Sequence, residues 1–216
     1  MSRCEAEIEA GLCPNAKFDD KGETLLTQSV KCGHYEIIEL FLKHGADPNI
    51  RNDDMDTPLL IAATIKNFEI CKMLVENGAS LAITSENGVT PLMTAAGEGD
   101  ADESMKIVEY FVEKGAEINE TDNNRNNVLH YAVPGCNKIV KFLLDKGAQV
   151  NLISKTGWTP LLIAGSRSSS GNALLLAQQG AGFTVGKTSF WNVATDCVKQ
   201  HLRLNGFNES NTLQEF

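Results

Sequence analysis

The sequence predicts an all-α solenoid of stacked helix-turn-helix units, because two signals recur along the chain at a spacing of about 33 residues. The first signal is a Thr-Pro-Leu string, or the related Thr-Leu-Leu, which begins at Thr24, Thr57, Thr90 and Thr159. The second is a Gly-Ala pair after an apolar stretch, and it begins at Gly45, Gly78, Gly115, Gly147 and Gly180. Two short helices and a turn cannot bury their apolar faces alone, so each unit is expected to stack on its neighbours.

Each unit is expected to contain two helices. Thr57 can cap the first helix and Pro58 suits its first turn, since that position needs no N–H partner and proline presets the helical φ. The second helix carries apolar residues three and four positions apart, as in Ile37, Phe41 and Leu42. It is predicted to end at the glycine of the Gly-Ala pair, where a left-handed cap favours glycine.

The spacing of these signals defines three regions. Residues 1–18 are expected to form a partial N-terminal capping repeat, and residues 19–182 to form five repeats. Residues 183–216 are expected to contain a partial repeat, a C-terminal capping helix and a frayed tail from about Asn205. The capping helix is indicated by an apolar stripe that would shield the last core from water, formed by Val193, Cys197, Val198 and Leu202.

The repeated Thr-Pro-Leu start and the common spacing resemble the ankyrin repeat family. The resemblance covers most of the chain and implies hairpin-like tips between successive units. It also implies a protein–protein interaction module that meets its partner on a concave face made of the tips and the inner helices. His130, in the string Leu-His-Tyr-Ala, resembles the family's inter-repeat hydrogen-bonding histidine.

The tips are where a partner is expected to bind. The first three are acidic, the fourth is rich in amides, and the fifth offers a tryptophan. A row of like charges steers an oppositely charged partner, which favours a basic peptide or segment, although acidic tips can also serve only solubility. The predicted partner-binding residues are Asp20, Glu23, Asp53, Asp54, Asp56, Glu86, Asn123, Asn124 and Trp158.

Four departures from the repeat pattern stand out. The third unit is longer than the others, and its extra residues fall in the acidic, glycine-containing segment 97–104, which is expected to be a mobile loop. The fourth unit has Pro134-Gly135 between its helices, which is expected to shorten its first helix. The serine-rich segment 166–171 suggests a loose connection, with phosphorylation as the alternative. Met55 and Arg125 replace the glycine found in the other tips.

No motif supports catalysis, a cofactor or a metal site. Residues 181–188 end in Gly-Lys-Thr like a phosphate-binding loop, but Ala181 replaces the first glycine, and a short tail leaves no room for the required sheet. The four histidines, His34, His44, His130 and His201, lie on different elements without metal-ligand spacing. The chain is therefore not expected to be an enzyme.

Composition narrows the range of partners. A net charge of −9 argues against nucleic acid, because phosphate binding depends on clustered lysine and arginine. No apolar run approaches the ~20 residues that span a bilayer, so no membrane insertion is expected.

The six cysteines lack disulfide-like spacing, which favours a cytoplasmic or nuclear location. We expect a monomeric adaptor that binds a protein or peptide; the alternative is an assembly or scaffold segment of a larger protein.

Overall fold

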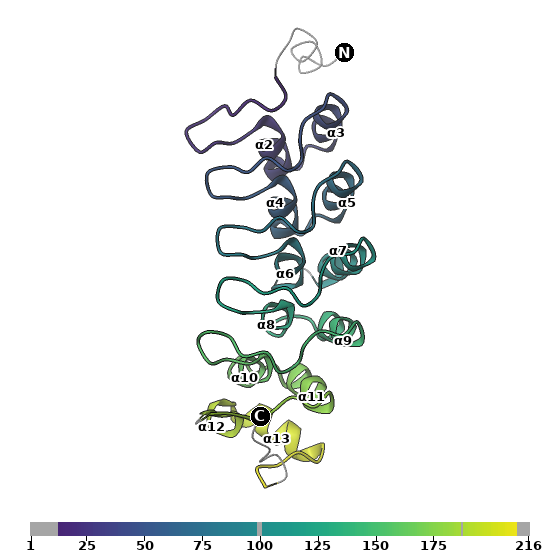
Figure 1. Ribbon diagram of the computed structural model, residues 1–216. Coiled ribbons are helices and arrows are strands. Elements are labelled where there is room, and N and C mark those ends of the chain that lie inside the picture. The colour runs from purple at the N-terminus through teal and green to yellow at the C-terminus, as the bar shows by residue number, and fades with distance from the viewer. Residues whose placement is uncertain (1–12, 99–100, 187, 211–216) are drawn as a thin grey trace. The chain divides into compact units, whose positions relative to one another are not determined.

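The computed structural model describes residues 13–98, 101–186 and 188–210, and helices arranged in successive pairs dominate it (Figure 1). The expected N-terminal cap and tail therefore lie partly outside the described residues. The pairs are α2 (Leu25–Cys32) with α3 (Tyr35–Lys43), α4 (Pro58–Thr64) with α5 (Phe68–Glu76), α6 (Pro91–Ala96) with α7 (Ala101–Glu113), α8 (Val128–Ala132) with α9 (Asn137–Asp145), α10 (Pro160–Ser166) with α11 (Ser170–Gln178), and α12 (Phe190–Val193) with α13 (Asp196–Leu204).

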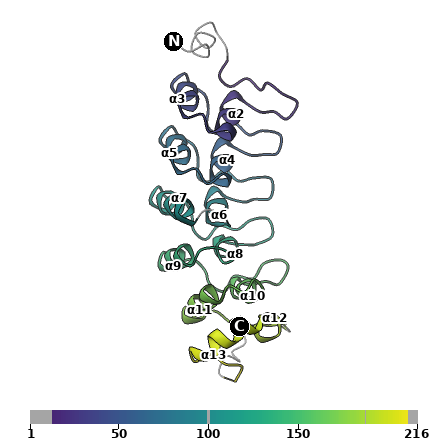
Figure 2. The ribbon, with the colours of Figure 1, turned by 180° about the vertical axis from the view of Figure 1, so that it is seen from behind.

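The chain divides into two compact units. Unit 1 comprises the residues up to Ala95 together with Lys106–Ala116, and unit 2 comprises Ala96–Met105 and the residues from Glu117 onward. Within unit 1, α2 packs on both α3 and α4, as the two opposite views show (Figures 1 and 2). Within unit 2, α11 packs on α9, α10 and α13. This stacking of helix pairs confirms the predicted all-α solenoid class.

Each unit has its own apolar core, made by side chains that are almost completely buried. In unit 1 these include Leu26, Ile38, Leu59, Ile70, Leu74 and Leu92. In unit 2 they include Leu129, Ile139, Leu143, Leu161, Leu176 and Phe190. These residues come from first and second helices alike, so burial couples the two helices of a repeat to those of the next.

The helices begin and end where the sequence predicts. Thr57 and Thr159 accept the N–H of Leu60 and Leu162 through Oγ1, and each is followed by the proline that begins the helix. The second helices stop just before the Gly-Ala pairs, whose glycines have positive φ, such as +82° at Gly45. The C-terminal glycine is therefore required by backbone conformation.

A five-residue tip precedes the first helix of each of five repeats, at residues 19–23, 52–56, 85–89, 122–126 and 154–158. In the second tip, the N–H of Asn52 donates to the Asp56 carbonyl at 3.0 Å, and the N–H of Asp56 donates to Asn52 Oδ1 at 2.8 Å. The same two bonds close the last three tips through Ser85, Asp122 and Ser154. These closures make the predicted hairpin-like tips.

The fourth residue of each tip adopts a left-handed conformation. Glycine meets this requirement in three tips, whereas Met55 and Arg125 adopt it with φ of 62° and 60°. A residue with a Cβ atom adopts the left-handed conformation at a steric cost, and the two hydrogen bonds that close the tip offset this cost. The second and fourth tips therefore keep this conformation without a glycine.

Asparagine side chains join successive repeats. Asn119 Nδ2 donates to the Gly147 carbonyl at 3.1 Å, and its Oδ1 accepts the N–H of Gln149 at 2.9 Å. Equivalent pairs of bonds are made by Asn15, Asn49 and Asn151, each four residues after a glycine of the repeat. Ala82 stands at the same position after Gly78, and its methyl group cannot make either bond.

Two of the predicted irregular segments are more regular than expected. Residues 101–104 of the insertion form the first turn of α7, because Asp102 and Glu103 suit a helix N-terminus and Ser104 is buried against the core. Residues 99–100 lie outside the described residues. The serine segment also contributes helical residues, since Ser166 ends α10 and Ser170 begins α11. Burial of Ala173 and Leu176 holds α11 in place without a side-chain cap.

The C-terminal region also differs from its prediction. Val198 and Leu202 are buried as expected, but Cys197 is exposed and does not belong to the apolar face. The chain does not fray at Asn205. Instead the N–H of Phe207 donates to the Leu202 carbonyl at 3.1 Å, and its ring stacks on Phe183 at 5.9 Å. Burial of an aromatic ring outweighs the polar composition of this segment.

Among the helices of the described residues, none combines the length and apolar character required to cross a bilayer. The helices of the described residues are short, from four residues in α12 to thirteen in α7. Their apolar residues also lie on one face, which the neighbouring repeats cover.

His130 lies at the third position of α8 and makes the predicted inter-repeat hydrogen bond. Its Nε2–H donates to the Trp158 carbonyl at 3.1 Å, and its Nδ1 lies 2.7 Å from Oδ1 and 3.2 Å from the backbone nitrogen of Asn127. Burial lowers the pKa of His130, although the bond to Trp158 and the charge of Asp122 oppose the shift. The neutral imidazole thus links the fourth repeat to the fifth tip.

Replacing Asn119 by alanine should lower the free energy of unfolding by about 1–2 kcal/mol, since two hydrogen bonds between repeats are lost while water can reach the freed groups. The measurement is urea unfolding followed by circular dichroism. Asn124→Ala is the matched control, because Asn124 is exposed in the same unit and its side chain makes no hydrogen bond there. Equal destabilisation by the two substitutions would contradict the role of the asparagine bridge.

The stability of the protein should fall as the pH is lowered from about 7 to about 5.5, because the unfolded chain takes up a proton at His130 while the folded protein resists it. The folded pKa is depressed, so the stabilising contribution is complete above the unfolded pKa and is lost as the pH falls through the folded one. His130→Gln should flatten this part of the stability profile. An unchanged slope in His130→Gln would show that other groups cause the effect.

Candidate functional site

The tip geometry separates the nine predicted binding residues into two sets. The second and third residues of each tip form its apex, and the apex residues Asp20, Asp53, Asp54, Glu86, Asn123 and Asn124 are all exposed. The fifth residue returns toward the first helix, and this position is occupied by Glu23, Asp56 and Trp158. None of these three is as open to solvent as the apex residues, so they contribute differently to any binding surface.

Glu23 is not exposed at its tip, contrary to the prediction, because it takes part in a buried network between two repeats. Its side chain is 3% exposed, and Oε1 accepts hydrogen bonds from Lys31 Nζ at 2.5 Å and Asn52 Nδ2 at 2.8 Å. Burial alone would raise the pKa of Glu23, but the bonds from Lys31, Thr27 and Asn52 outweigh it and leave the pKa lowered. The ionised carboxylate therefore serves the fold.

Asp56 is half-buried close to the same network. Burial raises the pKa of Asp56, and the negative charges of Asp54 and Glu23 raise it further, although Lys31 opposes them. Its negative charge is therefore maintained less readily than that of the exposed apex acids. Asp56 is a weaker candidate for attracting a basic partner than Asp53 or Asp54.

The apex acids of unit 1 form the strongest candidate surface. We use the name acidic tips for Asp20, Asp53, Asp54 and Glu86, which lie on three successive tips. Lys17 lies 3.4 Å from Asp53, but both side chains are about half exposed, so the pair is weak and open to competition. A backbone bond of 2.9 Å from the Asp53 N–H to the Lys21 carbonyl holds the first two tips together.

Two exposed apolar side chains lie on these tips, and the sequence analysis did not select them. Phe18 is 50% exposed immediately before the first tip, and Met55 is 38% exposed in the second. Large exposed apolar groups beside charges are typical of surfaces that bind other proteins. Their signal in the sequence is weak, because only the tip conformation shows that these side chains face solvent.

The tips of unit 2 carry the amides and the tryptophan. Asn123 and Asn124 are exposed at one apex, and the Asn124 carbonyl accepts the N–H of Lys155 from the next tip at 2.8 Å. Trp158 is half-buried, and its backbone carbonyl accepts hydrogen bonds from Ser154 and His130. The tryptophan side chain is thus presented from a firmly held backbone, as an anchor requires.

A second buried polar network supports the fourth tip. Tyr131 donates its hydroxyl to Asp122 Oδ2 at 2.6 Å, and the N–H groups of Asn124 and Asn126 donate to Asp122 Oδ1. Burial alone would raise the pKa of Asp122, but these hydrogen bonds lower it. The sequence analysis did not select Asp122. It is nevertheless the first residue of its tip, the position that Asn52 and Ser85 hold in the two preceding tips.

The segment that resembles a phosphate-binding loop has a different structure. Strands β1 (Thr184–Val185) and β2 (Thr188–Ser189) pair antiparallel as a short hairpin, whereas a phosphate loop joins a parallel strand to a helix N-terminus. Lys187 lies outside the described residues. Within the ranges that the structure describes, no three His, Cys, Asp or Glu side chains gather as metal ligands would.

Comparison with known proteins identifies the repeats. A family model described as ankyrin repeats matches three times, over residues 26–122, 59–154 and 101–187. An ankyrin repeat-containing protein of Schizosaccharomyces pombe is 32% identical over 59 residues, which are 27% of this chain and 28% of that protein. The 2-5A-dependent ribonuclease of Mus musculus is 40% identical over 60 residues, 28% of this chain and 8% of the ribonuclease.

A fowlpox virus ankyrin repeat protein is 46% identical over 52 residues, 24% of this chain and 7% of the viral protein. The aligned segments thus span less than a third of each of these relatives. Ankyrin repeats are general protein–protein interaction modules. The three overlapping matches and the stacked helix pairs show that the chain belongs to the ankyrin repeat family.

Proposed function

We propose that the protein binds a basic segment of a partner protein through the acidic tips of unit 1. The observation that carries this proposal is the exposure of Asp20, Asp53, Asp54 and Glu86 on three successive tips. Successive repeats place these carboxylates at regular intervals, which suits an extended segment with several lysine or arginine residues. Phe18 and Met55 offer apolar contact beside the charges.

The acidic tips are pre-organised for such a segment. Asp19, Asn52 and Ser85 each accept the N–H of the fifth tip residue, so the apex does not have to order on binding. A pre-formed loop loses less conformational entropy than a flexible one, and the saved free energy contributes to affinity. The buried Glu23 contributes indirectly, because its carboxylate joins the first tip to α2 through Lys31 and to the second tip through Asn52.

The charges determine mainly how fast the partner arrives. Exposed carboxylates interact with a basic segment over about one Debye length, which is about 10 Å at 0.1 M ionic strength. They therefore raise the association rate more than they slow dissociation. An apolar anchor acts on dissociation instead, and Trp158 in unit 2 is the candidate for this role, with the adjacent amides Asn123 and Asn124 supplying hydrogen bonds.

Changing Asp20, Asp53 and Asp54 together to Asn should slow association with a lysine- and arginine-rich peptide about tenfold at low salt, because steering is lost. The dependence of the association rate on salt should also flatten. The measurement is stopped-flow binding of fluorescently labelled peptides at low and high ionic strength. The fold should be nearly unchanged, since these side chains are exposed and the Lys17–Asp53 pair contributes ~0–1 kcal/mol.

The matched control changes Glu69, Glu109 and Glu113 to Gln, because these acids are exposed on second helices of the same unit. Both triple variants remove three negative charges from the net charge of −9, so the overall charge is equal. The proposal requires slow association in the tip variant alone. If the two variants slow association equally, the tips act only through net charge and serve solubility.

Trp158→Ala should raise the dissociation rate of the same peptides with little change in the association rate. If the ring is a hot spot, the binding free energy weakens by ~2 kcal/mol or more. Leu204→Ala is the control, because Leu204 is an apolar side chain 80% exposed in the same unit. The melting temperature of each variant is recorded alongside. Unchanged dissociation in Trp158→Ala would confine the binding site to unit 1.

An alternative function is assembly as a scaffold segment within a larger protein. It is supported by the relatives, in which the aligned segments occupy 7–28% of the length. Loss of assembly on substitution of second-helix residues, with the tips intact, would favour this alternative.

We infer binding rather than catalysis, since the strands on either side of the Gly-Lys-Thr string pair as a hairpin and His130 serves the fold. Among the described residues, Cys13, Cys32, Cys71, Cys136 and Cys197 are free thiols, which supports a cytoplasmic or nuclear location. We propose that the protein is a monomer there.

A further inference from the structure

Second helices carry charges at three outward positions in the first four repeats. α3, α5 and α9 are each nine residues long, and their second, fifth and ninth residues lie three and four positions apart on one side of the helix. The last nine residues of α7 follow the same pattern. All twelve positions, three in each of these four helices, hold Glu, Lys or Asp, as in Glu36, Glu39 and Lys43 of α3. These charges keep the outward side of the repeats in water.

The same three positions carry no charge in α11 and α13, which are also nine residues long. They hold Gly171, Leu174 and Gln178 in α11, and Cys197, Gln200 and Leu204 in α13. We use the name uncharged face for these six residues. α11 packs on both α9 and α13, and Figures 1 and 2 show the three helices one after another. The loss of charge therefore affects adjacent helices of unit 2.

Packing within the chain explains little of the uncharged face. A Cβ atom at Gly171 would collide with the Asn137 side chain of α9, so a glycine is needed there. Leu204, in contrast, is 80% exposed, so the core does not account for it. α11 is an exception among the helices, because residues 173–177 are all alanine or leucine and make it apolar on every side, and Leu174 is partly exposed. A helix that is apolar all round is normally covered all round. The outward side of α11 therefore suits contact with another molecule.

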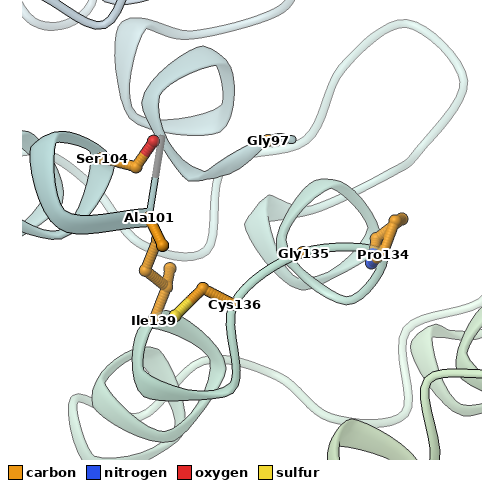
Figure 3. A pocket seen from close by; sticks show the side chains of 7 residues that line it. All are labelled: Gly97, Ala101, Ser104, Pro134, Gly135, Cys136 and Ile139. Carbon is orange, nitrogen blue, oxygen red and sulfur yellow. The ribbon is translucent and has the colours of Figure 1, made fainter. Parts of the chain in front are cut away.

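The orientation of α9 places two lysines beside this face. Figure 3 shows Ile139 of α9 directed toward Ala101 of α7, and both residues line a cavity of about 340 Å³. Lys138 and Lys141 occupy outward positions of the same helix and are exposed. Because α9 packs on α11, these lysines border the uncharged face.

The charge around the uncharged face is positive. The segments that include α9, α11, α13 and their flanking residues are 136–146, 166–180 and 195–205. They contain six Lys or Arg and two Asp, so their balance is +4, whereas the whole chain carries −9. Arg203 of α13 is exposed and lies over the Trp191 ring at 5.5 Å. An apolar area with a positive border is complementary to an apolar surface with a negative border.

The size of the uncharged face favours a short helix as the element that covers it. The first and last outward positions of a helix are seven residues apart, which is about 10 Å at 1.5 Å per residue, and packed helices lie about 8–10 Å apart. This area is well below the ~800 Å² that each partner buries in a stable interface, so it does not suit a second copy of the chain. It matches one side of a helix of two or three turns, and such helices are a common mode of recognition.

We propose that the uncharged face docks a short amphipathic helix of a partner protein. The apolar residues of that helix pack against Leu174 and Leu204, and acidic residues on either side of them approach the lysines of α9 and the arginine of α13. Gln178 and Gln200 are exposed, and their amides donate and accept hydrogen bonds at the edge of the contact. The surface consists of second helices and does not involve the acidic tips, whose basic partner its lysines repel.

Cys197 reports occupancy, because its exposed thiol belongs to the uncharged face, whereas Cys13 and Cys32 are exposed in unit 1 and serve as internal controls. The probe is a peptide of about four turns, held helical by lactam bridges, with a stripe of leucine flanked by glutamate and without cysteine. At about three times its Kd it should slow alkylation of Cys197 by iodoacetamide about fourfold, since only the unoccupied face reacts. Peptide mass spectrometry gives the rate at each cysteine. A scrambled peptide of the same composition should not protect Cys197.

The apolar contribution is tested by changing Leu174 and Leu204 together to Gln. This variant should bind the acidic peptide at least about tenfold more weakly, because apolar contact is lost without a change of charge. Its melting temperature should stay close to that of the parent, since the equivalent positions are polar in the first four repeats. Ile65→Gln with Ile153→Gln is the matched control, because both isoleucines are exposed elsewhere, by 44% and 36%. This control should bind the peptide as the parent does.

The charged border is tested by changing Lys138 and Lys141 together to Gln. The Kd for the acidic peptide should rise about fivefold at low salt and less at high salt, because two exposed charge pairs are lost. Lys43→Gln with Lys114→Gln removes the same charge from exposed positions of unit 1 and should leave the Kd unchanged. The variant with Asn at Asp20, Asp53 and Asp54 should retain protection of Cys197, which separates this test from that of the acidic tips.

Several results would overturn the proposal. One is the absence of protection at Cys197 with the acidic helical peptide at millimolar concentration, and another is equal protection by the scrambled peptide. Binding to phosphatidylserine vesicles that is tighter than binding to the peptide, and that is lost in the variant with Gln at Leu174 and Leu204, would assign the face to a membrane. Dimerisation in analytical ultracentrifugation that the same variant abolishes would assign it to a second copy of the chain.

Discussion

Every repeat of this protein depends on its neighbours to bury one face of its helix pair. Side chains such as Leu59 and Ile70 in unit 1, or Leu161 and Leu176 in unit 2, are fully buried only because adjacent repeats cover them. Helices of four to thirteen residues are too short to be stable alone in water, so this packing is what holds them. The asparagine bridges add directional bonds between repeats, because each joins a side chain to the backbone of the next repeat.

The exposure of the proposed binding residues is a consequence of how the tips are closed. A side-chain oxygen at the first position holds the N–H of the fifth, and the residues between them project into solvent. Two acids only three residues apart, Asp20 and Glu23, therefore have different surroundings: Asp20 is exposed, whereas Glu23 is buried and pairs with Lys31. Removing Lys31 would leave the buried Glu23 carboxylate without its counter-charge, whereas the charges of the apex acids stay in solvent.

Irregular repeats supply the features that set this chain apart. The short α8 and the extended α7 leave a cavity that a regular unit would fill with side chains, and Ser104 is left without a partner beside it. Natural sequences break local rules chiefly where function compensates for the cost.

The sequence by itself determined the repeat spacing, the threonine caps, the prolines and the C-terminal glycines, and these predict the helices and the ankyrin fold. These features are local, because a cap or a left-handed turn involves residues within one helical turn of each other. Only the tertiary structure decided the burial of Glu23, since its partner Asn52 is 29 residues away in the next repeat. The same holds for Phe207, which packs on Phe183, and for residues 101–104, which become helical when Ser104 is buried. Burial depends on what the neighbouring repeat presents, and a local pattern does not contain that information.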